Sequence, residues 1–293
     1  MKANLTLFLV TIFTLVCLYT SAQELKSDAS VSVYSGIVNY EGDLKPNSFT
    51  FSHSNFFAGV IYRKKLNRWF TWRIAFSQGK LEGADKYNRN YLRPRNLSFY
   101  TSVTEAYTAL SVTVLDLSVK RFTPYLYGGI GIFHFNPWTK DADGKKVYLQ
   151  PLSTEGQGLP EYPDRKVYHL TQWMMPFGLG FKYMVSENFS AALELSQRKT
   201  FTDYIDDVST RYVDENVLLN AKGLKAVELA YRGDEVPGGA MNSHTGDIRG
   251  TPSEMDWYYF LGVVLEVKLS IVKDFFSFRD KSTNWYYRKC PKF

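Results

Sequence analysis

In the stretch WYYFLGVVLEVKLSIV, residues 257–272, apolar residues occupy every second position. One set of alternate positions is apolar throughout, and the other carries Gly262, Glu266, Lys268 and Ser270. Alternate residues of an extended strand share a face, and strands of soluble sheets are usually about 5 to 6 residues long. A barrel strand in lipid faces apolar residues outward, faces polar ones inward and takes roughly 9 to 11 residues per crossing. The stretch therefore predicts a transmembrane β-strand.

The N-terminus has the pattern of an export signal. Lys2 precedes an apolar run over residues 5–18, and Thr20-Ser21-Ala22 supplies small residues for cleavage. A lipoprotein signal ending at Cys17 is disfavoured, because a bulky residue precedes the cysteine where a small one is expected. The run is also shorter than the roughly 20 residues of a transmembrane helix. We therefore predict a signal peptide over residues 1–22.

The composition fits a barrel better than a bundle of membrane helices. The mean hydropathy of −0.25 is too low for several membrane helices, whereas a barrel exposes only alternate strand residues to lipid. Aromatic residues make up 16% of the chain, which fits interfacial girdles but also an aromatic-rich soluble sandwich. Cleavage after Ala22 would remove one lysine and no acid, which lowers the formal net charge from +6 to +5.

Eight stretches have the length and alternation of spanning strands. We predict an all-β protein, an eight-stranded antiparallel transmembrane β-barrel over residues 23–272, with long extracellular loops and a periplasmic C-terminal tail over residues 273–293. The predicted strands are Ala29–Tyr40, Asn55–Leu66, Trp69–Leu81, Phe99–Leu117, Thr123–Phe135, Leu170–Val185, Phe189–Phe201 and Trp257–Val272.

The predicted connections fall into two classes. The second, fourth and sixth strands are followed by short turns, whereas the first, third, fifth and seventh are followed by loops near residues 41–54, 82–98, 136–169 and 202–256. Short periplasmic turns and long outer loops are typical of the outer membrane of bacteria. Because the number of strands is even, we expect the N- and C-termini on the same side, in the periplasm.

Charged residues fall on the predicted inner faces of several strands. An eight-stranded barrel is filled by its own side chains, and unpaired buried charge is costly. We therefore expect a paired network that excludes water, so that the barrel is plugged. In the fifth strand, Tyr125 to Phe133, bulky residues at both parities leave the inner face undecided. The charged residues expected in the lumen are Arg73, Lys182, Glu194, Arg198, Glu266 and Lys268.

Two acidic segments of the outer loops invite a metal interpretation. Asp203, Asp206 and Asp207 could ligate a cation or act as a carboxylate pair, but we favour helix capping and loop ordering. The segment 141–144, Asp-Ala-Asp-Gly, fails the calcium-loop pattern, because Thr139 and Gln150 would stand where Asp and Glu are required. An Asp-Gly turn in a hairpin is the better interpretation.

A loop-based enzyme is the minority hypothesis. Of the four histidines, His169 or His244 could activate water beside Asp206 and Asp207, but no nucleophile motif accompanies them. The chain has no phosphate loop, zinc spacing or dinucleotide fingerprint. We therefore predict a non-enzymatic protein with no cofactor and no nucleic-acid partner.

Several long segments together resemble one family of outer-membrane barrels. They are Tyr40-Glu41-Gly42-Asp43-Leu44, the run from Pro124 to Pro137, the run from Leu149 to Gly158, Pro176-Phe177-Gly178-Leu179-Gly180, the run from Thr200 to Asp214, and Arg232-Gly233-Asp234. In these segments the chain resembles the PorG family of the type IX secretion system of Bacteroidota. The resemblance implies a non-enzymatic barrel in contact with the periplasmic ring of the lipoprotein PorK and PorN. It supplies no catalytic residues.

The tail offers a candidate for that contact. It holds six basic residues, two acidic ones and seven aromatics, residue types that dominate interface energetics. A tail that folds under the barrel as a plug remains an alternative. The candidate partner-binding residues are Phe275, Phe276, Trp285, Tyr286, Tyr287 and Lys289.

Cys290 is the only cysteine left after cleavage, so an intramolecular disulfide is impossible. A leftover cysteine in an exported protein suggests an intermolecular bond or a free thiol. We predict a disulfide to a ring subunit, with an inert thiol as the alternative. A small outer-membrane channel remains the other functional alternative, besides the surface enzyme.

Overall fold

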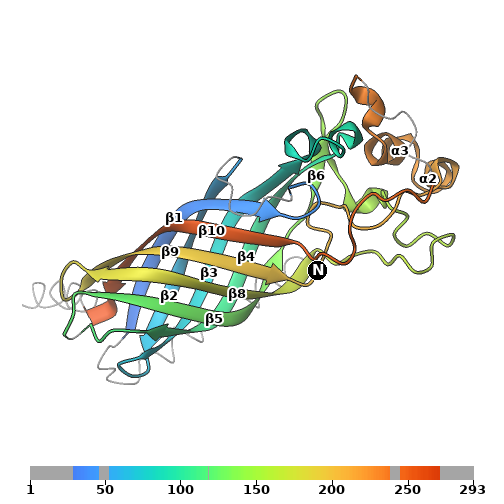
Figure 1. Ribbon diagram of the computed structural model, residues 1–293. Coiled ribbons are helices and arrows are strands. Elements are labelled where there is room, and N and C mark those ends of the chain that lie inside the picture. The colour runs from blue at the N-terminus through green and yellow to red at the C-terminus, as the bar shows by residue number, and fades with distance from the viewer. Residues whose placement is uncertain (1–28, 46–52, 118, 238–244, 271–293) are drawn as a thin grey trace, which may run out of the picture.

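Eight strands close into a barrel. The computed structural model describes residues 29–45, 53–117, 119–237 and 245–270, and Figure 1 shows the strands tilted around a common axis. The barrel strands are β1 (Ala29–Glu41), β2 (Asn55–Lys65), β3 (Phe70–Ala84), β4 (Ser98–Thr113), β5 (Phe122–His134), β8 (Thr171–Met184), β9 (Phe189–Thr200) and β10 (Trp257–Lys268).

Every pairing between neighbouring barrel strands is antiparallel. The strand order runs β3-β2-β1-β10-β9-β8-β5-β4, and the additional pairing of β3 with β4 closes the sheet. The last strand, β10, pairs with β1 on one side and with β9 on the other, so neither the first nor the last strand leaves an unpaired edge inside lipid. The predicted eight-stranded antiparallel barrel is confirmed.

The outer surface of the barrel is apolar. Outward-facing aliphatic side chains such as Val33, Ile74, Ile130 and Leu193 are between 42% and 57% exposed. Aromatic side chains flank this aliphatic band, with Phe122 stacked on Phe181 toward the short turns. Toward the loops the flanking aromatic residues are Trp173, Phe177 and Trp257. An aliphatic band between aromatic girdles is the surface of a transmembrane barrel.

The structure shows which face of strand β5 points into the barrel, a question that the sequence left undecided. Tyr125, Tyr127 and Phe133 point inward, whereas the bulky residues between them are exposed. At Gly129 a Cβ atom would lie 2.1 Å from the carbonyl oxygen of Thr108 on β4, so only glycine allows this close approach of the two strands.

The short turns and long loops lie at opposite ends of the barrel, as Figure 1 shows. β4 ends at Thr113, four residues before the predicted end, because the amide of Leu115 donates to the Thr123 side chain, and the amides of Val119 and Lys120 donate to the carbonyl of Asp116. β10 ends at Lys268. The predicted signal peptide, residues 271–272 and the tail lie outside the described residues.

The long loops build a cap beyond the barrel. The predicted hairpin in the third loop is present, with Gly144 at φ +76° in its turn. The fourth loop carries two short helices that the sequence did not predict, and Asp214 caps the first by accepting hydrogen bonds from the amides of Asn216 and Val217. The loop elements are β6 (Trp138–Lys140), β7 (Lys146–Tyr148), α2 (Glu215–Lys222), α3 (Leu224–Ala230), η1 (Asp85–Tyr87), η2 (Arg93–Arg95), η3 (Gln150–Leu152) and η4 (Gly233–Glu235).

No helix within the described ranges has the length and apolar character needed to cross a bilayer.

Candidate functional site

The barrel interior holds a fully buried ion pair between β3 and β9. The guanidinium of Arg73 donates to both carboxylate oxygens of Glu194, at 3.0 and 3.2 Å. The hydroxyls of Tyr125 and Tyr127 donate to the same carboxylate, at 2.7 and 3.0 Å. Glu194 therefore has four donors around it, which is the condition under which a buried charge is tolerated.

A second buried pair lies closer to the cap. Arg198 of β9 binds Glu105 of β4, with Nη2 2.7 Å from Oε1. Ser77 and Tyr258 donate to the two oxygens of Glu105, at 2.8 and 2.6 Å. The Arg198 guanidinium also lies among aromatic rings, 5.6 Å from the centroid of Phe57. Each of these two pairs is electrically neutral.

The third cluster, near the short turns, is different. Glu266 of β10 accepts from Lys182 at 2.7 Å and lies 3.4 Å from the guanidinium of Arg63. Ser30 donates to its other oxygen at 2.8 Å. Two cations thus share one carboxylate. Lys268, which the sequence placed in the same network, is exposed at the turn end.

The structure thus brings five of the six predicted lumen residues into ion pairs. It adds Arg63 and Glu105, which the sequence analysis missed. Both occupy inward positions of their strands, so the same alternation rule applied to β2 and β4 would have found them. The tyrosine donors carry no such signal, because the parity of an aromatic residue does not reveal its hydroxyl partner.

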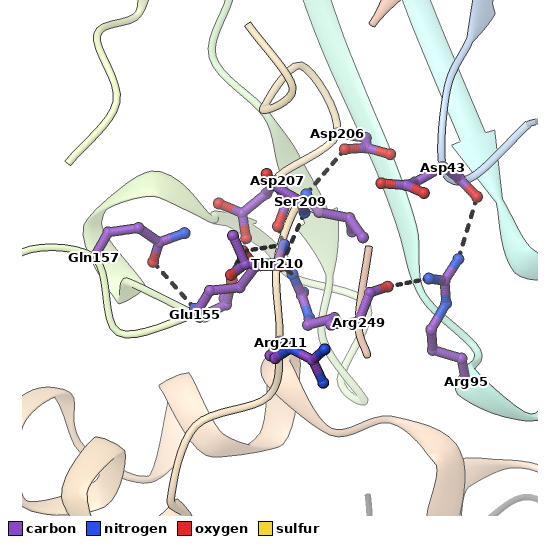
Figure 2. Close-up of polar contacts among 12 residues, drawn as sticks. Asp43, Arg95, Glu155, Gln157, Asp206, Asp207, Ser209, Thr210, Arg211 and Arg249 are labelled. Carbon is purple, nitrogen blue, oxygen red and sulfur yellow. Dashed lines mark hydrogen bonds and ion pairs between the residues drawn. The ribbon is translucent and has the colours of Figure 1, made fainter. Parts of the chain in front are cut away.

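The cap is organised around a buried carboxylate. Figure 2 shows Glu155 beside Arg249 and the segment that contains Ser209 and Thr210. Arg249 donates to Glu155 at 2.9 Å, and the amides of Ser209 and Thr210 donate to its two oxygens, each at 2.9 Å. Glu155 therefore joins the third loop to two distant parts of the fourth loop.

Asp207 orders the same loops. Thr154 and Tyr168 donate to its two oxygens, at 2.5 and 2.6 Å. Burial raises the pKa of Asp207 to about 6, although the nearby Arg249 acts to lower it. Both oxygens are engaged by loop side chains, which is the ordering role favoured from the sequence.

Asp206 and Asp256 meet at one phenol. The hydroxyl of Tyr40 lies 2.7 Å from Asp206 and 2.6 Å from Asp256, and all three side chains are buried. A phenol carries one proton, so Tyr40 can donate to only one carboxyl, and the other contact needs a proton on the carboxyl itself. Burial and mutual repulsion accordingly raise the pKa of Asp206 well above its ordinary range.

Further carboxyl groups surround this pair. Burial and the charge of Asp206 raise the pKa of Asp203 to about 9, and burial also raises the pKa of Asp43. One oxygen of Asp203 has no hydrogen-bond partner among the described residues. Burial and Asp203 raise the pKa of Asp256. The cap thus concentrates acids in a place where ionisation is unfavourable.

Within the described residues, no group of three or more His, Cys, Asp or Glu side chains is arranged to hold a metal ion. Among the histidines, His53 packs on Tyr87, and His134 lies 3.0 Å from Thr171 on the outer face of the barrel. His169 is exposed. His244 lies outside the described residues.

The predicted tail residues cannot be placed. Cys290, Phe275, Phe276, Trp285, Tyr286, Tyr287 and Lys289 all lie outside the described residues. The partner-binding and disulfide predictions therefore stay predictions.

The family comparison covers most of the chain. Residues 6–221 match the sequence profile of a family described as "Domain of unknown function (DUF6089)". None of the curated proteins matches this chain in sequence.

Several solved outer-membrane proteins are distantly similar. Neisserial surface protein A has 10% identity and a TM-score of 0.40, over 83% of this chain and 97% of its own. The Yersinia pestis attachment invasion locus protein Ail, in complex with sucrose octasulfate, has 9% identity and a TM-score of 0.37, over 83% and 99%. Outer membrane protein OprG of Pseudomonas aeruginosa has 10% identity and a TM-score of 0.37, over 82% and 96%. The fold assignment rests on the strand pairing of this chain itself.

Proposed function

We propose that this chain, which belongs to the DUF6089 family, is a non-enzymatic outer-membrane component of the type IX secretion system. In this role the barrel holds a fixed place in the membrane and anchors or contacts the periplasmic ring of PorK and PorN. The sequence resemblance to PorG proteins supports the assignment to the type IX secretion system and the proposed contact with PorK and PorN. The observation that carries the membrane part is the apolar outer band around a sealed, ion-paired interior.

Short turns at one end and long loops at the other support the orientation. In outer-membrane barrels the short turns face the periplasm and the long loops face outside. The first and last strands then start and end in the periplasm, near Ala29 and Lys268. The tail would follow on the side where ring proteins lie.

Membrane insertion is tested with Trp72, which lies on the outer face and is 37% exposed. Acyl chains brominated at graded depths should quench its fluorescence in vesicles. Trp138, on a cap hairpin, provides the comparison position. Measuring each tryptophan in a variant with the other five changed to Phe should give quenching at Trp72 only. Equal quenching at both positions would contradict a membrane-embedded barrel with an external cap.

The channel alternative is disfavoured by the interior. Two hydrogen-bonded ion pairs fill it, Arg73 with Glu194 and Arg198 with Glu105, and all four side chains are at most 1% exposed. We therefore expect no continuous water path there. Planar bilayers with the purified full chain should show no steady conductance. Reproducible conductance steps would favour the channel.

The enzyme alternative rests on His169 and His244 beside Asp206 and Asp207. Both oxygens of Asp207 accept from Thr154 and Tyr168, which is a poor starting point for a general base. We therefore expect His169→Ala and His244→Ala to leave secretion of type IX cargo intact. A loss of secretion in either variant, with normal amounts of the barrel in the membrane, would favour the enzyme hypothesis.

The partner proposal is tested by affinity purification of the intact membrane complex. PorK and PorN should co-purify with the full chain and be lost on deletion of residues 273–293. The aromatic variant Trp285→Ala/Tyr286→Ala/Tyr287→Ala should lose more ring protein than Arg288→Gln/Lys289→Gln, because aromatic anchors contribute most to interfaces. Full recovery of the ring with the truncated chain would remove the tail from the contact.

The disulfide proposal has its own readout. Non-reducing electrophoresis of membranes should show a band at the summed mass of the chain and a ring subunit, and Cys290→Ser should abolish it. If wild type and variant both migrate as the single chain, Cys290 is an unpaired thiol. The ring contact itself does not depend on this result.

A further inference from the structure

The turn end of the barrel contains a cavity of about 450 Å³. It is framed by the start of β1, the ends of β2, β4 and β10, and the turn between β8 and β9. The ion pair of Arg73 and Glu194 lies deeper in the barrel and closes the way to the cap. The cavity therefore lies on the side of this pair that faces the short turns.

The walls of this cavity carry an excess of positive charge. Two of its carboxylates are Glu266, on the floor, and the exposed Glu187, in the β8–β9 turn. Against these two acids stand five basic side chains, which leaves an excess of three positive charges. The basic side chains, which we call the basic mouth, are Arg63, Lys65, Arg68, Lys182 and Lys268.

The excess begins on the buried floor. Arg63 is 4% exposed and shares the single carboxylate of Glu266 with Lys182. Arg63 also donates to the hydroxyl of Ser32, a neutral partner. The two deeper pairs of the barrel contain one carboxylate for each guanidinium, but this floor lacks one. A buried cation without a full counter-charge is costly, so an anion in the cavity would stabilise it.

The rim adds three exposed cations. Lys65, Arg68 and Lys268 have no carboxylate partner among the described residues, and they surround the opening. The flanking sequences do not balance this charge, because residues 273–293 hold six basic and two acidic residues, and residues 23–28 hold two acidic residues and one basic residue. The complement by charge is a separate, acidic molecule.

We infer that the basic mouth binds an acidic protein segment, with a Glu or Asp carboxylate seated between Arg63 and Lys182 and further acids on the rim lysines. The cavity lies inside the barrel wall, which favours side chains of a protein over a lipid surface, because lipid would meet the outer face. The inference takes only the periplasmic orientation of the turns from the proposed function. Of the tail it uses only the net positive charge of residues 273–293, and it makes no use of Cys290.

The test uses the full chain in detergent and fluorescently labelled hexaglutamate. Binding should weaken steeply as salt rises, because exposed charges are screened. The rim variant Lys65→Gln/Arg68→Gln/Lys268→Gln should raise the dissociation constant by about tenfold, the scale expected when three exposed ion pairs are lost. The control variant Lys140→Gln/Lys145→Gln/Lys166→Gln removes three exposed lysines from the cap and should bind as wild type.

Two further arms decide the remaining cases. Arg63→Gln reaches the floor, so it should weaken binding even where the rim is intact. Inorganic phosphate at equal charge concentration should compete poorly, since it cannot span floor and rim. Equal losses in the rim and control variants, no binding by wild type, or displacement by phosphate as effective as by unlabelled hexaglutamate would overturn the inference. Because the assay contains no ring protein, failure of PorK and PorN to co-purify leaves it unaffected.

Discussion

The barrel interior and the outer cap both bury many charged groups, but they balance them differently. In the middle of the barrel each carboxylate faces one guanidinium, as in Arg73 with Glu194 and Arg198 with Glu105. In the cap, Arg249 binds Glu155, whereas Asp206 and Asp256 share a phenol, and no cation of the described residues forms an ion pair with them. The barrel interior balances its charges in ion pairs, whereas the cap avoids charge by keeping protons on its acids.

The two arrangements should respond differently to pH. A neutral pair keeps its hydrogen bonds at any ordinary pH, so the barrel stays closed to water. A cluster of acids is neutral only while protons remain bound, so we expect the order of the cap to depend on pH. Breaking a pair should therefore affect the whole barrel, and ionising the cluster should affect the cap alone.

The largest effect is expected from Glu194→Gln. The change leaves the Arg73 guanidinium buried without a counter-charge, which typically costs about 3 to 5 kcal/mol. Urea unfolding in lipid vesicles, followed by tryptophan fluorescence and by the gel shift between folded and unfolded barrel, measures it. The double variant Arg73→Met/Glu194→Leu removes both charges and should recover most of the loss. A single variant as stable as wild type would show that the pair is solvated.

A smaller effect is expected from pH and from Asp203→Asn. The pKa of Asp203 is raised from 3.8 to about 9, so the folded cap keeps a proton that the unfolded chain releases. Its stabilisation is complete below about pH 4 and is lost as the pH rises toward 9. Asparagine mimics the protonated acid and should stabilise the cap at pH 9 by on the order of 1 to 3 kcal/mol, with little change at pH 4.

Limited proteolysis of residues 201–237 at pH 5, 7 and 9 measures this effect in vesicles. The exposed Asp234→Asn serves as the matched control and should cleave as wild type at every pH. The barrel should resist proteolysis throughout. If wild type and Asp203→Asn show the same pH dependence, the proton resides on another member of the cluster, such as Asp206.

The barrel could be predicted from the sequence because its determinants are local. The alternation in residues 257–272 places Val263 and Leu265 outward, and the structure has both 47% exposed. Parity also placed Arg73, Glu194 and Arg198 inside. The partner of Arg198 was not foreseen, because Glu105 lies on β4 and strand order and register decide which inward residues meet.

The cap could not be predicted in the same way. Its acids come from four separate stretches, around Asp43, Glu155, Asp206 and Asp256, and no period links them. The three clustered aspartates pointed to the right loop, but the contact of Tyr40 with Asp206 spans 166 residues. The basic mouth was visible only in part, since Lys182 and Lys268 were assigned to the lumen but Arg63, Lys65 and Arg68 were not.

The smallest expected effect concerns a cap feature that involves no shared proton. The Asp214 carboxylate accepts from the amides of Asn216 and Val217 at the start of α2, at 2.9 and 3.1 Å. Asp214→Ala removes both acceptors and should cost about 1 kcal/mol, local to the helix. Hydrogen exchange at the amides of Asn216 and Val217 should accelerate by about fivefold, which is what 1 kcal/mol implies.

Asp214→Ser retains an acceptor at the N-cap position and should keep most of the protection. Measurements at two pH values separate Asp214 from Asp203. The half-buried Asp214 accepts only from backbone amides and shares no proton with another carboxyl group. The effect of Asp214→Ala should therefore be the same at pH 6 and pH 9, whereas that of Asp203→Asn changes. A pH-dependent loss at Asp214 would mean that the helix is coupled to the carboxyl cluster, and that the cap opens as one unit.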